Sequence, residues 1–202
     1  MFTWLPMLHL PKVPDHFVEM ALNATKQKHI VNTNAYMYNT GYQNRQLHKD
    51  GKAIPSRVQH GYPMSPEWEQ WVRENIVSDF IETSARMSVG DSDTHGIHAD
   101  NPFKWKFYYM LDRGGDNAET VFYKEKNQPI IRQSTADSIT CVNDYSDPNV
   151  FEVERVQFPL HTWVLFNATV LHGVEKITGD RKNIAISIVP DSIDFSFIQK
   201  NN

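Results

Sequence analysis

The sequence predicts an α+β fold in which a double-stranded β-helix (jelly roll) is supported by N-terminal helices. Two observations favour this fold: two segments with helical spacing of apolar residues come first, and about eight short strand patterns follow them. A chain of 202 residues suits a single domain with a sizeable core. We therefore expect one domain over 1–202, with a helical and loop support at 1–78 and a jelly-roll core at 79–190.

Two helices are expected in the first part of the chain. Pro14-Asp15 opens the first helix, with Asp15 as the N-cap and with apolar residues recurring at helical spacing after it. Ser65 and Pro66 begin the second, because serine is a favoured N-cap and proline is tolerated at the first helical position. One face of this helix is expected to pack in the core and consists of Trp68, Trp71, Val72, Asn75 and Ile76. Between the helices, residues 31–62 are expected to form long loops with one short strand.

After residue 79 the pattern changes to that of short strands. Gly, Pro, Asp and Asn separate the apolar runs, which is typical of antiparallel sheets. The expected strands are Phe80–Val89, Lys104–Leu111, Thr120–Tyr123, Ser138–Asn143, Val150–Phe158, Trp163–Phe166, Val170–Ile177 and Lys182–Val189.

Composition excludes several classes of protein. The net charge is −4 and no long basic run occurs, so nucleic-acid binding is not expected. The single cysteine, Cys141, rules out an intramolecular disulfide framework and a cysteine-rich zinc site, and it fits a reducing, cytoplasmic setting. The first residues lack the basic start of a signal peptide, and no apolar run reaches transmembrane length, so no membrane partner is expected. The expected partner is a small-molecule or peptide substrate, and the oligomeric state stays open.

A pair of ligand-type residues, His98 and Asp100, stands at a spacing that suits a strand. Residues i and i+2 of a strand point the same way, whereas on a helix they would lie on nearly opposite sides. We therefore expect a strand, or the end of one, at His98-Ala99-Asp100. His172 would complete a set of two imidazoles and one carboxylate, the ligands of non-haem Fe(II) sites with open positions. Taken alone, His98 and Asp100 would more often be a surface pair.

Five further segments carry a resemblance over about half of the chain. They follow in this order: Val89-Gly90-Asp91 before the His98–Asp100 pair, Tyr108-Tyr109-Met110-Leu111-Asp112, Gly114-Gly115 with Glu119-Thr120-Val121-Phe122, Pro159 with Val164-Leu165-Phe166-Asn167, and Leu171-His172-Gly173-Val174 with Thr178-Gly179-Asp180-Arg181. In this order they resemble the Fe(II)/2-oxoglutarate-dependent oxygenase superfamily, closest to its prolyl-4-hydroxylase-like branch.

The resemblance implies a set of functional residues. His98, Asp100 and His172 would hold Fe(II), and Arg181 would bind the distal carboxylate of the co-substrate 2-oxoglutarate through its forked guanidinium. Tyr108 is the second expected contact, although Tyr109 or Lys106 stays open because a register slip of one residue reverses the face of a strand. Asn183 stands where some relatives have a serine that helps to bind the co-substrate, which leaves that contact in doubt. The family's chemistry also admits ascorbate as an auxiliary reductant.

The function implied is a dioxygenase that hydroxylates an unidentified substrate, with a prolyl or peptidyl side chain as the class that the resemblance suggests. Two alternatives stay open: a cupin-type metal enzyme that does not use 2-oxoglutarate, and a non-catalytic jelly-roll binding module. His95 is expected to be a loop residue that lies near the substrate. Residues 31–45 and 124–150 are expected to wall the entrance to the site.

Overall fold

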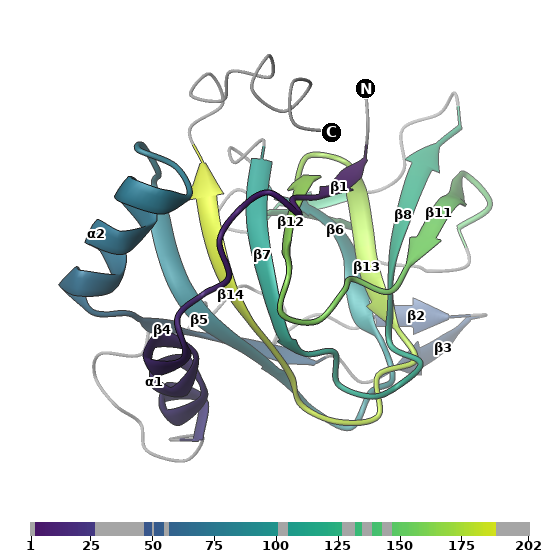
Figure 1. Cartoon of the computed structure of the whole chain (residues 1–202). Coiled ribbons are helices and arrows are strands. Elements are labelled where there is room, and N and C mark those ends of the chain that lie inside the picture. Colours follow the sequence, from purple (N-terminus) through teal and green to yellow (C-terminus); the bar gives the residue numbers. More distant parts are fainter. Residues whose placement is uncertain are drawn as a thin grey trace.

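The computed structural model of the chain describes residues 3–26, 47–49, 51–54, 57–100, 105–126, 132–134, 139–142 and 147–188. These residues form mostly antiparallel β-sheets with two helices, an arrangement consistent with a jelly-roll-like sandwich (Figure 1). Residues 31–45 lie outside the described residues, as do 127–131, 135–138 and 143–146 within the 124–150 connection. Their expected place at the entrance therefore stays a prediction, as does the extent of the domain over 1–202.

The major sheet has six strands and carries the co-substrate side of the expected site. In spatial order its strands are β1 (Trp4–Pro6), β12 (Trp163–Asn167), β7 (Trp105–Asp112), β14 (Arg181–Ile188), β5 (Glu82–Val89) and β4 (Val58–Pro63). Every neighbouring pair in it is antiparallel.

The minor sheet also has six strands and carries the expected metal ligands. Its spatial order is β11 (Val150–Val156), β8 (Glu119–Glu125), β13 (Leu171–Glu175), β6 (His95–Asp100), β10 (Ile139–Val142) and β9 (Arg132–Ser134). A separate hairpin consists of β2 (Leu47–Lys49) and β3 (Lys52–Ile54).

The expected strands all have counterparts, with boundaries that differ by a few residues. The predicted ends Lys104, Ser138, Asn143 and Val189 lie outside the described residues. The main difference is β4, which extends the major sheet in a stretch that was expected to be mostly loop. It contains His60, Gly61 and Pro63, residues that are not typical of a strand interior, so its pairing with β5 outweighs its weak local preference.

The two helices, α1 (Asp15–Lys26) and α2 (Pro66–Asn75), cover the outer face of the major sheet (Figure 1). The predicted start of α2 is confirmed, because the Ser65 hydroxyl accepts a hydrogen bond from the backbone N–H of Trp68 and Pro66 is the first helical residue. Trp68 and Val72 of the predicted face are buried, but Asn75 is exposed. The prediction of Asp15 as an N-cap is wrong. Asp15 lies inside the first turn of α1, where its negative charge is favourable next to the positive end of the helix dipole.

Two apolar layers flank the major sheet. The outer layer joins the helices to the sheet and includes Phe17, Trp68, Phe107, Tyr109 and Trp163. The inner layer lies between the two sheets and is built from Met110, Phe122, Phe158, Val164, Phe166 and Ala168. Because the side chains of a strand alternate, β7 contributes its odd-numbered residues to the outer layer and Met110 to the inner one. The space between the sheets is therefore where Lys106 and Tyr108 also point.

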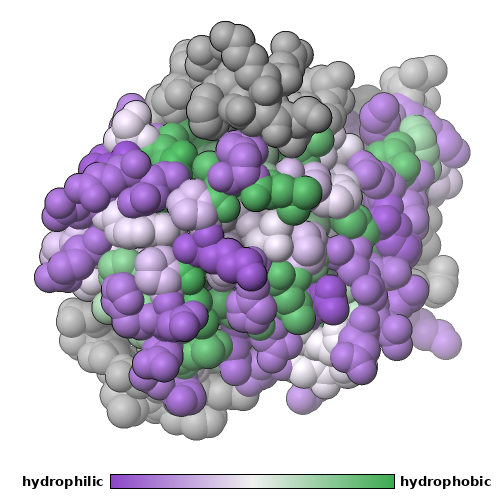
Figure 2. Space-filling view, viewed as in Figure 1, coloured by the Kyte–Doolittle hydropathy of each residue, from purple (hydrophilic) through white to green (hydrophobic). Residues whose placement is uncertain are grey.

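The surface seen in Figure 2 mixes polar and apolar residues, with hydrophilic side chains prominent over α2. Several large apolar side chains are exposed, namely Leu8, Ile81, Phe151, Val153 and Leu160. No helix among the described residues is both long and apolar enough to cross a membrane.

Candidate metal centre

The His98–Asp100 pair lies on β6, as the spacing predicts. Ile97 and Ala99 pack in an apolar cluster on one face of the strand, so that His98 and Asp100 share the other face. On the neighbouring strand β13, His172 is the direct cross-strand partner of His98. The ligand-type atoms of His98, Asp100 and His172 all lie within 4.8 Å of one another, and all three residues are buried. Strand pairing therefore brings together residues that are far apart in the sequence.

Both imidazoles are held in the same way. The Nδ1 atom of His98 lies 2.7 Å from the carbonyl oxygen of Gly96, and that of His172 lies 2.8 Å from the carbonyl oxygen of Val170. A carbonyl only accepts, so Nδ1 carries the proton in both rings and Nε2 carries the lone pair. The Nε2 atoms face Asp100, at 3.8 Å from Oδ1 for His98 and 3.9 Å from Oδ2 for His172. This tautomer is the one that a metal ion requires.

The carboxylate of Asp100 is held by a buried lysine. The Nζ atom of Lys106 donates to Oδ2 of Asp100 over 2.6 Å, and both side chains are almost completely buried. Burial acts to raise the pKa of Asp100, but the adjacent ammonium group of Lys106, followed by the neighbouring rings of His98 and His172, outweighs burial and holds the pKa below its usual value. Asp100 is therefore ionised at neutral pH, as a metal ligand must be.

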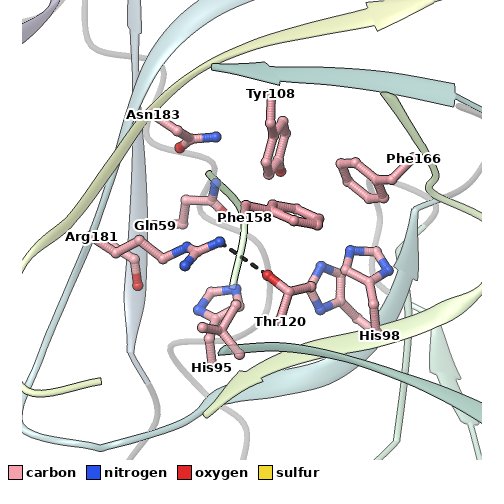
Figure 3. A pocket seen from close by; sticks show the side chains of 12 residues that line it. Gln59, His95, His98, Tyr108, Thr120, Phe158, Phe166, Arg181 and Asn183 are labelled. Atoms are coloured by element: carbon pink, nitrogen blue, oxygen red, sulfur yellow. Dashed lines mark hydrogen bonds between the residues drawn. The ribbon is translucent and has the colours of Figure 1, made fainter. Parts of the chain in front are cut away.

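A pocket extends from the two histidines to Arg181 at the start of β14 (Figure 3). Its walls come from both sheets and consist of Gln59, Ser88, His95, His98, Tyr108, Thr120, Phe158, Phe166, His172, Val174, Arg181 and Asn183. Four of the five predicted site residues thus line one pocket, and the fifth, Asp100, lies beside its two histidines.

Arg181 is buried at the polar end of this pocket. Its guanidinium donates to the hydroxyl of Thr120 over 3.2 Å and, more weakly, to the carbonyl of Arg113 over 3.4 Å. Desolvation lowers the pKa of Arg181 to about 10, so the side chain keeps its charge at neutral pH. Within the described part of the chain, no carboxylate forms a hydrogen bond or an ion pair with it.

The structure places Tyr108, and not Tyr109, in the pocket. Tyr109 packs on the opposite face of β7 against Trp163 and the helices. Tyr108 stacks edge-on against Phe166 and points into the pocket between Asn183 and Phe166 (Figure 3). The third residue left open, Lys106, reaches Asp100 instead of the Arg181 end. The alternation along β7 thus separates Tyr109 from Lys106 and Tyr108, and the contact with Asp100 separates Lys106 from Tyr108.

His95 was expected in a loop, and this expectation is wrong. It is the first residue of β6 and a buried wall of the pocket. Its ring lies 5.5 Å from that of His98, centroid to centroid, but it is not part of the group that could hold a metal. Desolvation, followed by the neighbouring charges of His98 and Arg181, lowers the pKa of His95 to about 3. His95 is therefore a neutral imidazole inside the pocket.

Two features that sequence reasoning missed hold the Arg181 end in place. Arg57, just before β4, donates to the carbonyls of Gly90, Ser92 and Gly179, and so ties two turns together. Gly114 has a φ of +81°, and a Cβ on it would lie 3.1 Å from Cβ of Arg181. Its carbonyl accepts from the backbone N–H of Gly179 over 2.9 Å. The turn after β7 therefore fits closely against the turn that leads into Arg181.

The buried histidines predict how stability depends on pH. Burial, followed by the charge of His98, lowers the pKa of His172 to about 3, and the pKa of His95 is lowered to a similar value. In the unfolded chain both rings take up protons below about pH 6.5, whereas in the folded chain they do not. The free energy of unfolding is therefore not reduced by these two histidines above about pH 6.5, and it falls as the pH drops towards 3. Each histidine should contribute roughly 2 kcal/mol of this loss between pH 6.5 and about pH 5.

Thermal unfolding with a chelator present, measured between pH 7.5 and 5, checks this expectation. His95→Gln keeps a polar side chain and should reduce the dependence of stability on pH by the contribution of one histidine. An unchanged slope in His95→Gln would contradict a neutral, buried His95.

No protein-family model and no curated protein matches the sequence. Among solved structures, a prolyl-4-hydroxylase from Pseudomonas putida is 11% identical, with 92% of each chain covered and a TM-score of 0.43. AviO1 from Streptomyces viridochromogenes is also 11% identical, with 95% of this chain and 91% of that chain covered and a TM-score of 0.43. L-ribose isomerase from Geodermatophilus obscurus is 10% identical, with 89% and 85% covered and a TM-score of 0.34. Because these identities and TM-scores are low, the proposed function rests on the residues of this chain alone.

Proposed function

We propose that this chain is an Fe(II)- and 2-oxoglutarate-dependent dioxygenase, and that its two sheets form a double-stranded β-helix around the site. One observation carries the proposal: the two histidines of a two-histidine, one-carboxylate group line the same pocket as a buried arginine that has no carboxylate partner among the described residues. The first suits Fe(II), and the second suits an anionic molecule that reaches the metal from the Arg181 end.

The charge of Arg181 supports an anionic ligand. A buried guanidinium has five N–H donors, and leaving such a charge without an anion is unfavourable. The hydrogen bonds given for Arg181 go to Thr120 and to the backbone of Arg113, both neutral acceptors. A carboxylate beside Arg181 would satisfy the remaining donors and offset the desolvation of the charge. A dicarboxylate such as 2-oxoglutarate has one carboxylate for Arg181 and a keto acid end for the metal.

A second polar group supports the same end of the pocket. The Nδ2 atom of Asn183 is buried, and no hydrogen-bond partner for it occurs among the described residues. Asn183 follows Arg181 on the same face of β14 and points into the pocket near Tyr108 (Figure 3). We infer that Asn183, Tyr108 and Thr120 complete the polar surroundings of the distal carboxylate. Some relatives have a serine at this position that helps to bind the co-substrate. We therefore assign the corresponding contact with the distal carboxylate to Asn183.

The metal group fits Fe(II) by the chemistry of its donors. His98 and His172 would supply neutral Nε2 atoms, and Asp100 would supply an ionised oxygen. Bound Fe(II) with 2-oxoglutarate and oxygen would supply oxidative decarboxylation to succinate and the oxidising power for hydroxylation. The chain's own residues orient these reactants. Phe158 and Phe166 form the apolar part of the pocket wall, which limits access of water to it.

The two other functions are less well supported. A cupin-type metal enzyme would not need a buried cation at the far end of the pocket, and this chain lacks the usual H-x-H arrangement. A non-catalytic binding module would have no need for a convergent His98, Asp100 and His172. For the substrate, a prolyl or peptidyl side chain stays our proposal, with ascorbate as an auxiliary reductant and the cytoplasm as the location.

Turnover of 2-oxoglutarate without a substrate tests the proposal. Many reactions of this type proceed slowly when the oxidant has no target, so purified protein with Fe(II) should release succinate above the rate of free Fe(II). Succinate is measured by mass spectrometry, and the Asp100→Asn variant provides the matched inactive protein. Wild-type protein that binds Fe(II) but releases no more succinate than Asp100→Asn would contradict the dioxygenase function and favour the cupin-type alternative.

A further inference from the structure

Lys106 is a buried charge that the proposed chemistry leaves without a role. It lies on β7 between Trp105 and Phe107, and only 3% of its surface is exposed. Lysines are rarely buried to this degree unless they are paired. Its ammonium group lies 2.6 Å from Oδ2 of Asp100, which is itself 5% exposed. The pair thus lies at the metal group, although Lys106 is not one of its ligand-type residues.

Lys106 contacts one of the two carboxylate oxygens of Asp100. Oδ1 of Asp100 faces His98 at 3.8 Å, and Oδ2 faces His172 at 3.9 Å. Lys106 donates to Oδ2, and in the described part of the chain it is the one hydrogen-bond donor to this carboxylate. His98 and His172 line the pocket, but Lys106 does not. The lysine therefore holds the carboxylate in the orientation that the two imidazoles require without occupying the pocket.

The charge of Lys106 has two opposite effects. A buried carboxylate without a counter-ion is strongly unfavourable, so Lys106 stabilises the folded chain whether or not a metal ion is bound. A divalent cation on Asp100 would, however, lie close to the ammonium group, and like charges repel strongly where water is excluded. The same lysine therefore stabilises the ionised Asp100 in the absence of metal and lowers the affinity of the site for a metal ion.

We propose that Lys106 is a positioning residue, the internal counter-ion of Asp100, which keeps the metal site formed independently of the metal and lowers its metal affinity. The inference rests on the proposed metal site. It means that the fold of this chain does not depend on metal, in contrast to sites whose ligands are stabilised by the ion alone. Removing the charge of Lys106 should convert the site to one whose ligands are stabilised by the metal ion alone.

Lys106→Met tests the inference, because methionine keeps most of the length and loses the charge. With a chelator present, breaking the buried pair should lower the melting temperature by roughly 6–20 °C relative to wild type. Co(II), an air-stable probe for the Fe(II) site, should then raise the melting temperature of Lys106→Met by more than it raises that of wild type. By linkage, the same variant should bind Co(II) more tightly in direct titration.

Three variants serve as controls. Lys106→Arg keeps the charge and should behave like wild type in its response to Co(II). The double variant Lys106→Met, Asp100→Asn removes both charges and should regain stability in the chelator while losing Co(II) binding. Lys176→Met removes a lysine that pairs with Glu119 over 2.8 Å but is 55% exposed, and it should change neither quantity. If Lys106→Met alone does not fold, recovery of folding in the double variant still tests the pairing.

The outcomes separate this inference from the proposed function. A purely structural lysine would lower the melting temperature equally with and without Co(II). An equal or smaller Co(II) shift in Lys106→Met than in wild type would therefore overturn the counter-ion role while leaving the metal site intact. A wild-type protein that Co(II) does not stabilise, and that does not bind Co(II) in titration, would overturn the metal site and this inference together.

Discussion

His98→Ala, Asp100→Ala and His172→Ala are each expected to abolish metal binding and metal-dependent turnover. Their ligand-type atoms lie within 4.8 Å of one another, so the loss of any one removes a corner of a three-ligand site. We expect Co(II) binding in wild type and none in these variants, as measured by calorimetric titration or native mass spectrometry. Circular dichroism of each variant checks that the fold is kept.

His95→Ala is the matched control, because it also removes a buried imidazole from the pocket wall. It should retain metal, since His95 is not part of the group that could hold an ion. A different result would revise the site: if His95→Ala loses the metal and Asp100→Ala keeps it, the ligand set includes His95 and a cupin-type site becomes the better account.

Arg181→Ala is expected to weaken 2-oxoglutarate binding steeply while metal affinity stays near that of wild type. Loss of a charge-assisted contact to a buried partner costs about 2–5 kcal/mol. This corresponds to roughly 30- to several-thousand-fold in affinity. Succinate release measured against 2-oxoglutarate concentration gives the size of the effect.

Two variants define the contribution of Arg181. Arg181→Lys should recover only part of the affinity, because an ammonium group lacks the planar fork that matches a carboxylate. Arg73→Ala removes an exposed arginine from α2 and should leave the 2-oxoglutarate requirement unchanged. Equal affinity for 2-oxoglutarate in wild type and Arg181→Ala would show that the anion binds elsewhere.

Local patterns were sufficient to predict most of the strands and the shared face of His98 and Asp100, whereas the roles of the expected site residues stay predictions. The alternation along β7 places Tyr108 between the sheets, and the i, i+2 spacing places His98 and Asp100 on one face. These features depend on the period of a single strand, which the sequence carries directly. The N-cap at Ser65 is similarly local, since one side chain and the next three residues define it.

Other features depend on pairing that the local sequence does not specify. The strand β4 forms because β5 offers it an edge, despite Gly61 and Pro63 within it. The ion pair of Lys106 with Asp100 joins two strands that belong to different sheets. A lysine between Trp105 and Phe107 was a signal of a buried charge, but nothing in the sequence indicated its partner. Arg57 gave no such signal, because its acceptors are backbone carbonyls in two distant turns.

Anaerobic titration of the wild-type protein with Fe(II) and 2-oxoglutarate tests the central claim most directly. A keto acid that chelates Fe(II) gives a weak charge-transfer band in the visible range, so the band reports that 2-oxoglutarate has reached the metal, and the concentration needed to form it reports the contribution of Arg181. We expect the band only when protein, Fe(II) and 2-oxoglutarate are all present, and we expect Arg181→Ala to need far more 2-oxoglutarate to reach it. A protein that binds Fe(II) but gives no band at saturating 2-oxoglutarate would contradict the proposed function.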